Sequence, residues 1–228
     1  MHLVQSHAPT LRDNPNPPAA TNRTASEVWH SMTLHDSPTD ARSEPSEADL
    51  SRAAFTLIRA AAACAAFCEH IEHNEPATTH QVVAAAESMR RVAAELSDQS
   101  GVSLRQAYEN RIRGVEATSL LRYSGTTEQV ELVGADALAS ARRWDEVQIA
   151  QLAHDRRFHP DVFGLPKIEQ LRHYSFHVTK LAGLLADAVE QGSWDAFRDE
   201  RLADIAVFGV KLATVCNEHL PSTDVDLT

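Results

Sequence analysis

The stretch "EQLRHYSFHVTKLAGLLADAVEQGSWDAFRDERLADIAVFGVKLATVCNE", residues 169–218, decides the fold class of this chain. Its apolar residues recur with the 3.6-residue period of an α-helix on both sides of a Gly-Ser pair. Gly192 lies past the end of one helix and Ser193 opens the next. We therefore predict two helices, over about 166–190 and about 194–219, that fold back on each other as a hairpin.

The helical period extends back along the chain to Ser46. Further helices are predicted from the capping box "SEAD" to about Ile71, over about 78–98, over about 103–123, and from the residues after "TTEQ" to near Arg157. We find no alternating strand and no Asn-Gly or Asp-Gly hairpin turn. The sequence therefore predicts an all-α fold, an antiparallel bundle of about five to six helices in a single domain over 47–228.

The N-terminal residues 1–46 have a different composition. Six of the ten prolines fall in this segment, among Ser, Thr, Asn, Asp and His and with few large apolar residues. Such a segment buries too little apolar surface to offset the entropy lost on ordering. We predict a disordered tail, within which Met32 is an alternative translation start.

Composition also indicates where the protein works. The net charge is −11 and the basic residues form no run, so a nucleic acid is not an expected partner. The most apolar stretch, 53–67, is 15 residues long and interrupted by Arg59, which predicts that it does not span a membrane. Cys64, Cys68 and Cys216 are interpreted as buried thiols of a reducing compartment. We expect a cytoplasmic protein.

Histidines are concentrated in "HDRRFHPDVFGLPKIEQLRHYSFHVTK", residues 154–180. His173 and His177 are one helical turn apart, a spacing that can bind one transition-metal ion, and His154, His159 or a carboxylate would complete the site. A metal-dependent enzyme that uses these four histidines is therefore one hypothesis. The alternative is that the cluster only forms hydrogen bonds and ion pairs at a junction between helices.

Two charged residues interrupt the apolar run of "ERLADIAVFGVKLATVC". Asp204 and Lys211 are seven residues apart and so share one face of the helix, next to Phe208. A carboxylate inside such a run must be paired, bind a metal or lie on a solvated edge. The favoured interpretation is an ion pair between Asp204 and a lysine or arginine of another helix.

Residues 169–218 resemble the helical core of MazG-like nucleoside triphosphate pyrophosphohydrolases. In that family a helix with an E-E-x-x-E pattern leads through a short "daieeGdwdal"-like turn to a helix that starts E-E-L-G-D, and "EQGSWDAFRDERLAD" is similar to this turn and entry. The family's acids hold Mg²⁺, which organises a nucleoside triphosphate for attack by water. The resemblance implies a MazG-like core over about 165–219.

Carried over residue by residue, the resemblance implies that the magnesium chemistry is lost. The two family glutamates of the first helix fall at His177 and Lys180, the first acid of the second pair falls at Arg201, and Asp204 is retained. Two cations and an imidazole in place of three carboxylates remove the negative charge that attracts a hard divalent ion. A magnesium cofactor is expected only if this site is functional.

A site of this composition suits an anion instead. His173, His177, Lys180, Arg201 and Lys211 would surround Asp204 with mildly cationic groups on an otherwise acidic chain. We predict that these residues bind a nucleotide-like or other anionic small molecule, without Mg²⁺-dependent hydrolysis of nucleoside triphosphates.

Self-association is also expected. The helix "DLSRAAFTLIRAAAACAAF", residues 49–67, offers small residues that let two helices approach closely, and MazG-like domains build their bundles from two or more chains. We predict a homodimer, and a non-catalytic oligomeric interaction module is a further alternative function. The preceding helices contain residues to which no motif assigns a role: Tyr108, Asn110, Arg111, Glu116 and Trp144.

Overall fold

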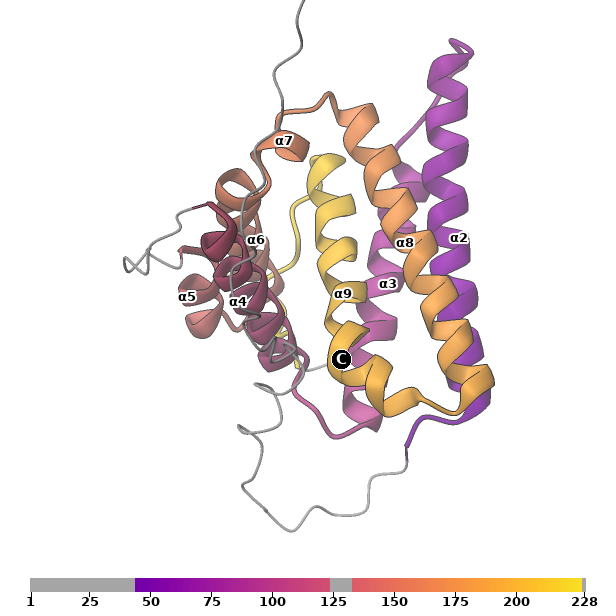
Figure 1. The fold of residues 1–228 in the computed structure, drawn as a ribbon. Helices are drawn as coiled ribbons and strands as arrows, with labels where there is room; N and C mark the ends of the chain where they lie inside the picture. The colour runs from indigo at the N-terminus through magenta and orange to yellow at the C-terminus, as the bar shows by residue number, and fades with distance from the viewer. Residues whose placement is uncertain (1–43, 124–132, 227–228) are drawn as a thin grey trace, which may run out of the picture. The chain divides into compact units, whose positions relative to one another are not determined.

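Eight helices and no β-strand are present in residues 44–123 and 133–226, the part of the chain that the computed structural model describes (Figure 1). The all-α prediction is confirmed. The helices are α2 (Glu47–Glu72), α3 (His80–Gln99), α4 (Leu104–Tyr123), α5 (Val133–Ser140), α6 (Trp144–Phe158), α7 (Pro160–Phe163), α8 (Lys167–Gln191) and α9 (Trp194–Val215). The predicted tail lies outside the described residues except at 44–46, and Met32 lies outside them altogether.

Local signals set several helix ends. The Ser46 side chain accepts a hydrogen bond from the Asp49 N–H at 3.2 Å, and the Asp49 carboxylate accepts one from the Ser46 N–H at 3.1 Å, which completes the capping box of α2. Gly101 and Gly192 have φ values of 68° and 61°, in the left-handed region that glycine adopts without strain. These features were readable in the sequence because each depends on neighbouring residues alone.

Four long helices form a closed bundle. α2 packs against α3 and α8, and α9 packs against the same two helices. Every adjacent pair is antiparallel, as the colours of Figure 1 show. Hydrogen bonds from Ser175 to the Ala61 carbonyl (3.3 Å) and from Cys68 to the Ile168 carbonyl (3.9 Å) fix the antiparallel register of α2 and α8. A single chain therefore supplies all four helices of the bundle.

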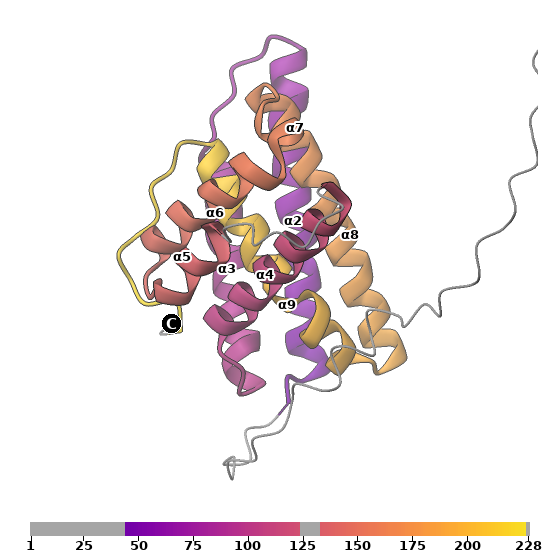
Figure 2. The ribbon, with the colours of Figure 1, turned by 60° about the vertical axis from the view of Figure 1, so that its left-hand side comes forward.

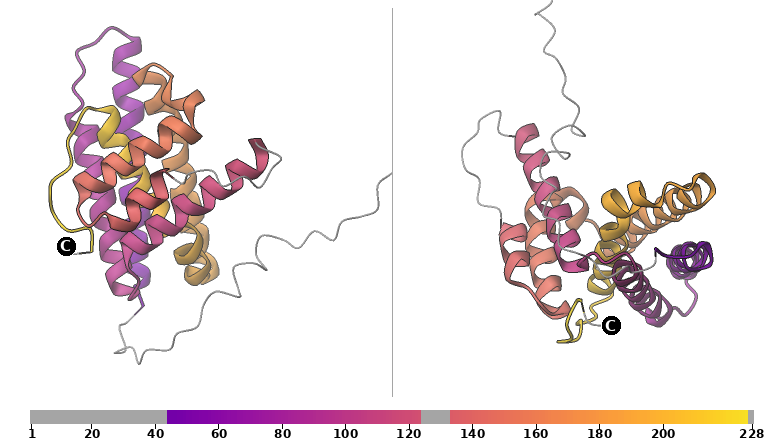
Figure 3. Two further views of the ribbon diagram at one scale, coloured as in Figure 1. Left: turned by 90° about the vertical axis from the view of Figure 1, so that its left-hand side faces the viewer. Right: turned by 90° about the horizontal axis from the view of Figure 1, so that it is seen from below.

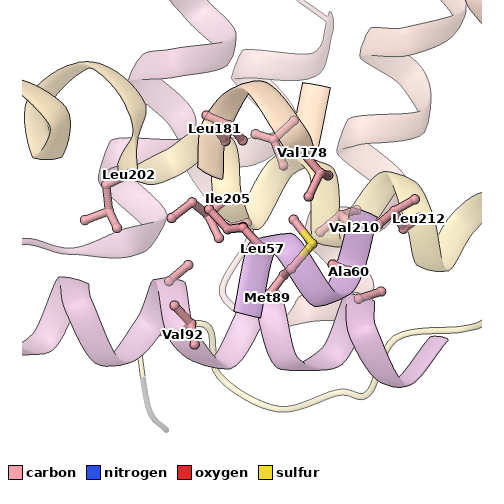
Figure 4. Close-up of a cluster of buried hydrophobic side chains, with 14 of the residues drawn as sticks. Leu57, Ala60, Met89, Val92, Val178, Leu181, Leu202, Ile205, Val210 and Leu212 are labelled. Carbon is pink, nitrogen blue, oxygen red and sulfur yellow. The ribbon is translucent and has the colours of Figure 1, made fainter. Parts of the chain in front are cut away.

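The centre of the bundle is apolar and well packed (Figure 4). Leu57, Met89, Val178 and Ile205 come from the four different helices and each has 0% of its surface exposed. Burying a side chain of this size contributes roughly 1.5 to 3 kcal/mol relative to leaving it in water. The core thus joins the α2–α3 hairpin to the α8–α9 hairpin.

The helices α4 to α7 form a second layer on one side of the bundle (Figures 2 and 3). α4 and α6 both pack against α9, and α5 contacts both α4 and α6. The short helix α7 packs against α6 and against α8 of the bundle. This layer covers the face of α9 that the bundle leaves open.

The helix predicted from "TTEQ" to Arg157 is wrong in one respect, because α5 and α6 are separate helices. Its first residues lie outside the described part of the chain, and the break falls between Ser140 and Trp144. The Trp144 N–H donates to the Thr223 carbonyl (3.0 Å), and the Val225 N–H donates to the Arg142 carbonyl (2.9 Å). The C-terminal segment replaces helical hydrogen bonds at the break, and local sequence gives no sign of a partner so distant along the chain.

α2 is longer than the apolar stretch within it. Its 26 residues make it the one described helix that is long and apolar enough to cross a membrane by length and composition alone. The core helix of a soluble protein passes the same test, and 33% of the most apolar window of α2 is buried. Burial also raises the pKa of the Cys64 thiol in this helix to about 12, so the thiolate is not populated near neutral pH.

Two glycines provide a matched test of the packing of α3 against α9. A Cβ atom added at Gly209 would lie 3.0 Å from the Ala86 carbonyl oxygen and 2.9 Å from the Arg90 Cγ, whereas one added at Gly183 would meet nothing within 4 Å. We expect Gly209→Ala to lower the free energy of unfolding by about 1 to 3 kcal/mol. Gly183→Ala should raise it by roughly 0.5 to 1 kcal/mol, because alanine is the better helix former.

Urea denaturation followed by circular dichroism measures both changes. Equal effects of the two substitutions would contradict the close approach of α3 and α9.

Candidate functional site

A cavity of about 200 Å³ lies between the bundle and the second layer, bordered by α4, α6, α7, α8 and α9. All eight residues that the sequence analysis selected as ligand-binding or metal-binding residues line it. Its charged and histidine side chains are Arg111, His154, Asp155, His159, His173, His177, Lys180, Arg201, Asp204 and Lys211. The structure therefore brings the predicted residues to one place, while their roles remain predictions.

One end of the cavity is organised around Asp204 of α9. Its Oδ1 accepts a hydrogen bond from the Nε of Arg111 at 2.5 Å, and its Oδ2 lies 3.6 Å from the Nη1 of Arg201. The predicted interhelical ion pair is thus present, with an arginine of α4 as the partner. Only the Nε of Arg111 is engaged in the described part of the chain, so its two terminal nitrogens keep free donors.

The other end is organised around Asp155 of α6. Its Oδ1 accepts hydrogen bonds from the Nζ of Lys211 and from the Nε2 of Gln151, both at 2.8 Å. Gln151 is held in turn by the hydroxyl of Tyr108, which donates to its Oε1 at 2.7 Å. The ammonium group of Lys211 also lies 5.7 Å from the ring centre of Tyr174. This network fixes one carboxylate and one cation at the cavity wall.

His154 is supported from behind by a fully buried contact with Glu116. The His154 Nδ1 lies 2.9 Å from the Oε1 of Glu116, and their side chains are 1% and 0% exposed. Glu116 also accepts the backbone N–H groups of Gly134 (3.1 Å) and Ala135 (3.3 Å). A Cβ atom at Gly134 would lie 2.6 Å from both Glu116 and His154, so only glycine fits there. This cluster joins α4, α5 and α6.

Sequence reasoning left Arg111 and Glu116 without a role. Tyr108, Ile112 and Glu116 follow one another at four-residue intervals, and all three are buried. A carboxylate on the apolar face of a helix was therefore a readable signal of a buried ion pair. No signal identified Gly134, because the tight space around it is created by α4 and α6.

Three histidines at the cavity are held neutral. Burial, then the charges of Lys211 and His154, lower the pKa of His159 to about 4. Burial and Lys211 lower the pKa of His173, and burial, His173 and the nearby lysines lower that of His177. The ring centroids of His173 and His177 are 4.7 Å apart. At neutral pH these imidazoles provide hydrogen bonds rather than charge.

The structure divides the predicted four-histidine set into two groups. In the described residues, His154, Asp155 and His159 have ligand atoms within 4.8 Å of one another, and this group does not include His173 or His177. Lys211 lies 2.8 Å from Asp155 and would face any cation bound there. At an effective dielectric constant near 20, a unit charge about 4 Å from a divalent ion costs roughly 8 kcal/mol.

The cavity is cationic although the whole chain carries a net charge of −11. Its described lining contains four permanent cations, Arg111, Lys180, Arg201 and Lys211, and two carboxylates, which leaves a net charge of +2. Lys180 is exposed and, within the described residues, forms no ion pair. The electric field of a positive cavity attracts small anions, even when the protein as a whole is negative.

Comparison of the chain with protein-family models, curated proteins and solved structures gives no match. The resemblance to the MazG-like proteins therefore stays a prediction.

The buried Glu116 cluster generates a stability prediction. Glu116→Ala should lower the free energy of unfolding by about 3 to 5 kcal/mol, because the change leaves two N–H groups and a buried imidazole without an acceptor. Glu116→Gln, which keeps one acceptor oxygen and the volume, should cost less. Glu95→Ala, at a glutamate whose side chain is 41% exposed, should stay within about 0.5 kcal/mol of the parent.

Chemical denaturation of the three variants measures these differences. A Glu116→Ala change no larger than that of Glu95→Ala would contradict the role assigned to the cluster.

Proposed function

We propose that the cavity binds a small anion that carries a phosphate or carboxylate group, such as part of a nucleotide-like molecule, and that it does so without Mg²⁺. The observation that carries this proposal is the excess of four fixed cations over two carboxylates in the cavity lining. Arg111 and Arg201 are held by Asp204 yet keep unused N–H donors, in the planar arrangement that suits oxyanions.

The residues at the implied magnesium positions do not fit that ion. Asp204 is the one carboxylate among the four carried-over positions, and Arg111 and Arg201 already engage both of its oxygens. Mg²⁺ requires oxygen ligands in near-octahedral geometry, which a carboxylate neutralised by two guanidinium groups does not supply. We therefore assign no hydrolytic step to Mg²⁺ at this site.

The size of the cavity narrows the ligand class. Its volume of about 200 Å³ is below the roughly 300 to 1,000 Å³ of pockets that enclose drug-sized ligands. A phosphate or pyrophosphate group fits inside, whereas the rest of a larger molecule would extend out of the cavity. The aromatic rings of Tyr174 and Phe208 at the wall would contact the adjoining organic part.

A second candidate function is a transition-metal enzyme built on His154, Asp155 and His159, which is favoured by the convergence of their ligand atoms within 4.8 Å. The cost of placing a divalent ion beside Lys211 opposes it.

Two lysines of α8 test the anion site. Lys180 lines the cavity and Lys167 does not, so the same substitution can be made at both positions. We expect Lys180→Gln to weaken binding of pyrophosphate roughly tenfold at low salt, because one cation is lost near the ligand. Lys167→Gln should change the affinity less than about twofold.

Isothermal titration calorimetry measures these affinities. The sign of a second change separates an anion site from a magnesium site at Asp204. Asp204→Asn should tighten pyrophosphate binding about fivefold or more, because it removes a competing negative charge and leaves an oxygen for Arg111. Release of pyrophosphate from a nucleoside triphosphate that requires Mg²⁺ and disappears in Asp204→Asn would overturn the proposal.

The lowered histidine pKa values predict a pH dependence. An anion placed beside His159, His173 and His177 raises their pKa values, so binding takes up protons as the pH falls from the ordinary histidine value of 6.5 towards about 4. Affinity for sulfate, whose own charge is constant in this range, should rise roughly tenfold between about pH 7.5 and about pH 5.5.

His177→Gln should reduce this rise, because one of the groups that takes up a proton is missing. An affinity for sulfate that stays constant or falls on acidification would contradict the proposed position of the anion.

A further inference from the structure

The outer face of α2 is apolar and uncovered in the described part of the chain. This face, which we call the α2 stripe, consists of Phe55, Ile58, Arg59, Ala62, Ala66 and Glu69, spaced at helical intervals. Phe55 is 65% exposed and Ile58 is 52% exposed. Large apolar side chains grouped on one exposed face mark a surface that binds another molecule.

The surface beside the stripe is hollowed. A groove of about 560 Å³ runs between α2 and α3, and its walls are mostly small side chains, among them Ala62 and Ala66 of α2 and Ala84 and Ser88 of α3. Small residues at a contact allow two helix axes to approach to the short end of the usual range of about 8 to 10 Å. The groove therefore has the form that receives a helix.

The charges of the stripe select the occupant. Arg59 and Glu69 are both exposed, and neither forms an ion pair with another described residue. They lie five residues before and five residues after position 64. When two α2 helices cross antiparallel about that position, Arg59 of each copy faces Glu69 of the other, and Ala62 faces Ala66. A parallel pair would place like charges together, which costs free energy.

We propose that two copies of this chain pair through the α2 stripe, antiparallel and about a two-fold axis near residue 64. The contact is self-complementary, as a two-fold interface requires: small residues lie at the centre, two Arg59–Glu69 pairs flank them, and Phe55 and Ile58 cover the ends. The bundle of each copy stays intact, because one chain already supplies its four helices. This interface is remote from the proposed anion site and does not depend on it.

Charge exchange on the full-length chain tests the pairing. Arg59→Glu and Glu69→Arg should each weaken dimerisation about tenfold or more, because each change creates two like-charge contacts. The double variant, Arg59→Glu with Glu69→Arg, restores opposite charges and should recover the parent dissociation constant to within about threefold. Asp187→Arg, a charge reversal of the same size at an exposed position of α8, should leave dimerisation unchanged.

Sedimentation equilibrium at micromolar concentration measures the dissociation constants, and circular dichroism checks that each variant is folded. A monomeric parent chain, or a double variant as weak as the single ones, would overturn the proposal. The same measurements distinguish a second copy of the chain from a lipid surface. A parent chain that is monomeric in solution but floats with phosphatidylcholine vesicles, and loses that property in Phe55→Ser, would assign the stripe to lipid and reject the second copy.

Discussion

The second layer of the structure depends on one constraint, which is that α9 is buried and yet carries charge. Of its 22 residues, 13 are buried, and Asp204 is among them. A buried carboxylate must be paired, and the partner, Arg111, comes from α4. Lys211, two turns further along α9, finds its partner in Asp155 of α6. The two ion pairs thus position the second layer against the bundle.

The same constraint creates the cavity. Apolar side chains close the interface between the four bundle helices, as Figure 4 shows, but the face of α9 that carries charges cannot be closed in the same way. Space remains between the ion pairs at its two ends, and histidines of α6 and α8 fill part of the wall. A helix that is apolar on the side of the bundle and charged on the other side is a simple way to place a polar cavity next to a rigid core.

The electrostatics of the cavity follow from how these pairs are composed. Each carboxylate meets at least one cation, and Lys180 adds a further one at the exposed rim. Burial and neighbouring cations lower the pKa values of His159, His173 and His177, so these three imidazoles add no positive charge near neutral pH. An arriving anion therefore meets fixed cations first and can recruit protonated histidines as it binds. The buried Glu116 supports His154 from behind this wall and does not itself line the cavity.

The sequence by itself determined the helical class, most helix ends and the eight residues that were expected to form a site. These depend on period, capping residues and glycines, all of which act through neighbours within a few positions. Tertiary structure alone decided the break between α5 and α6. There the C-terminal segment forms hydrogen bonds with the backbone of Arg142 and Trp144. Tertiary structure also decided the partner of Asp204 and the need for glycine at position 134. Each of these is a contact between residues far apart in the chain, and no local pattern encodes which distant group will arrive.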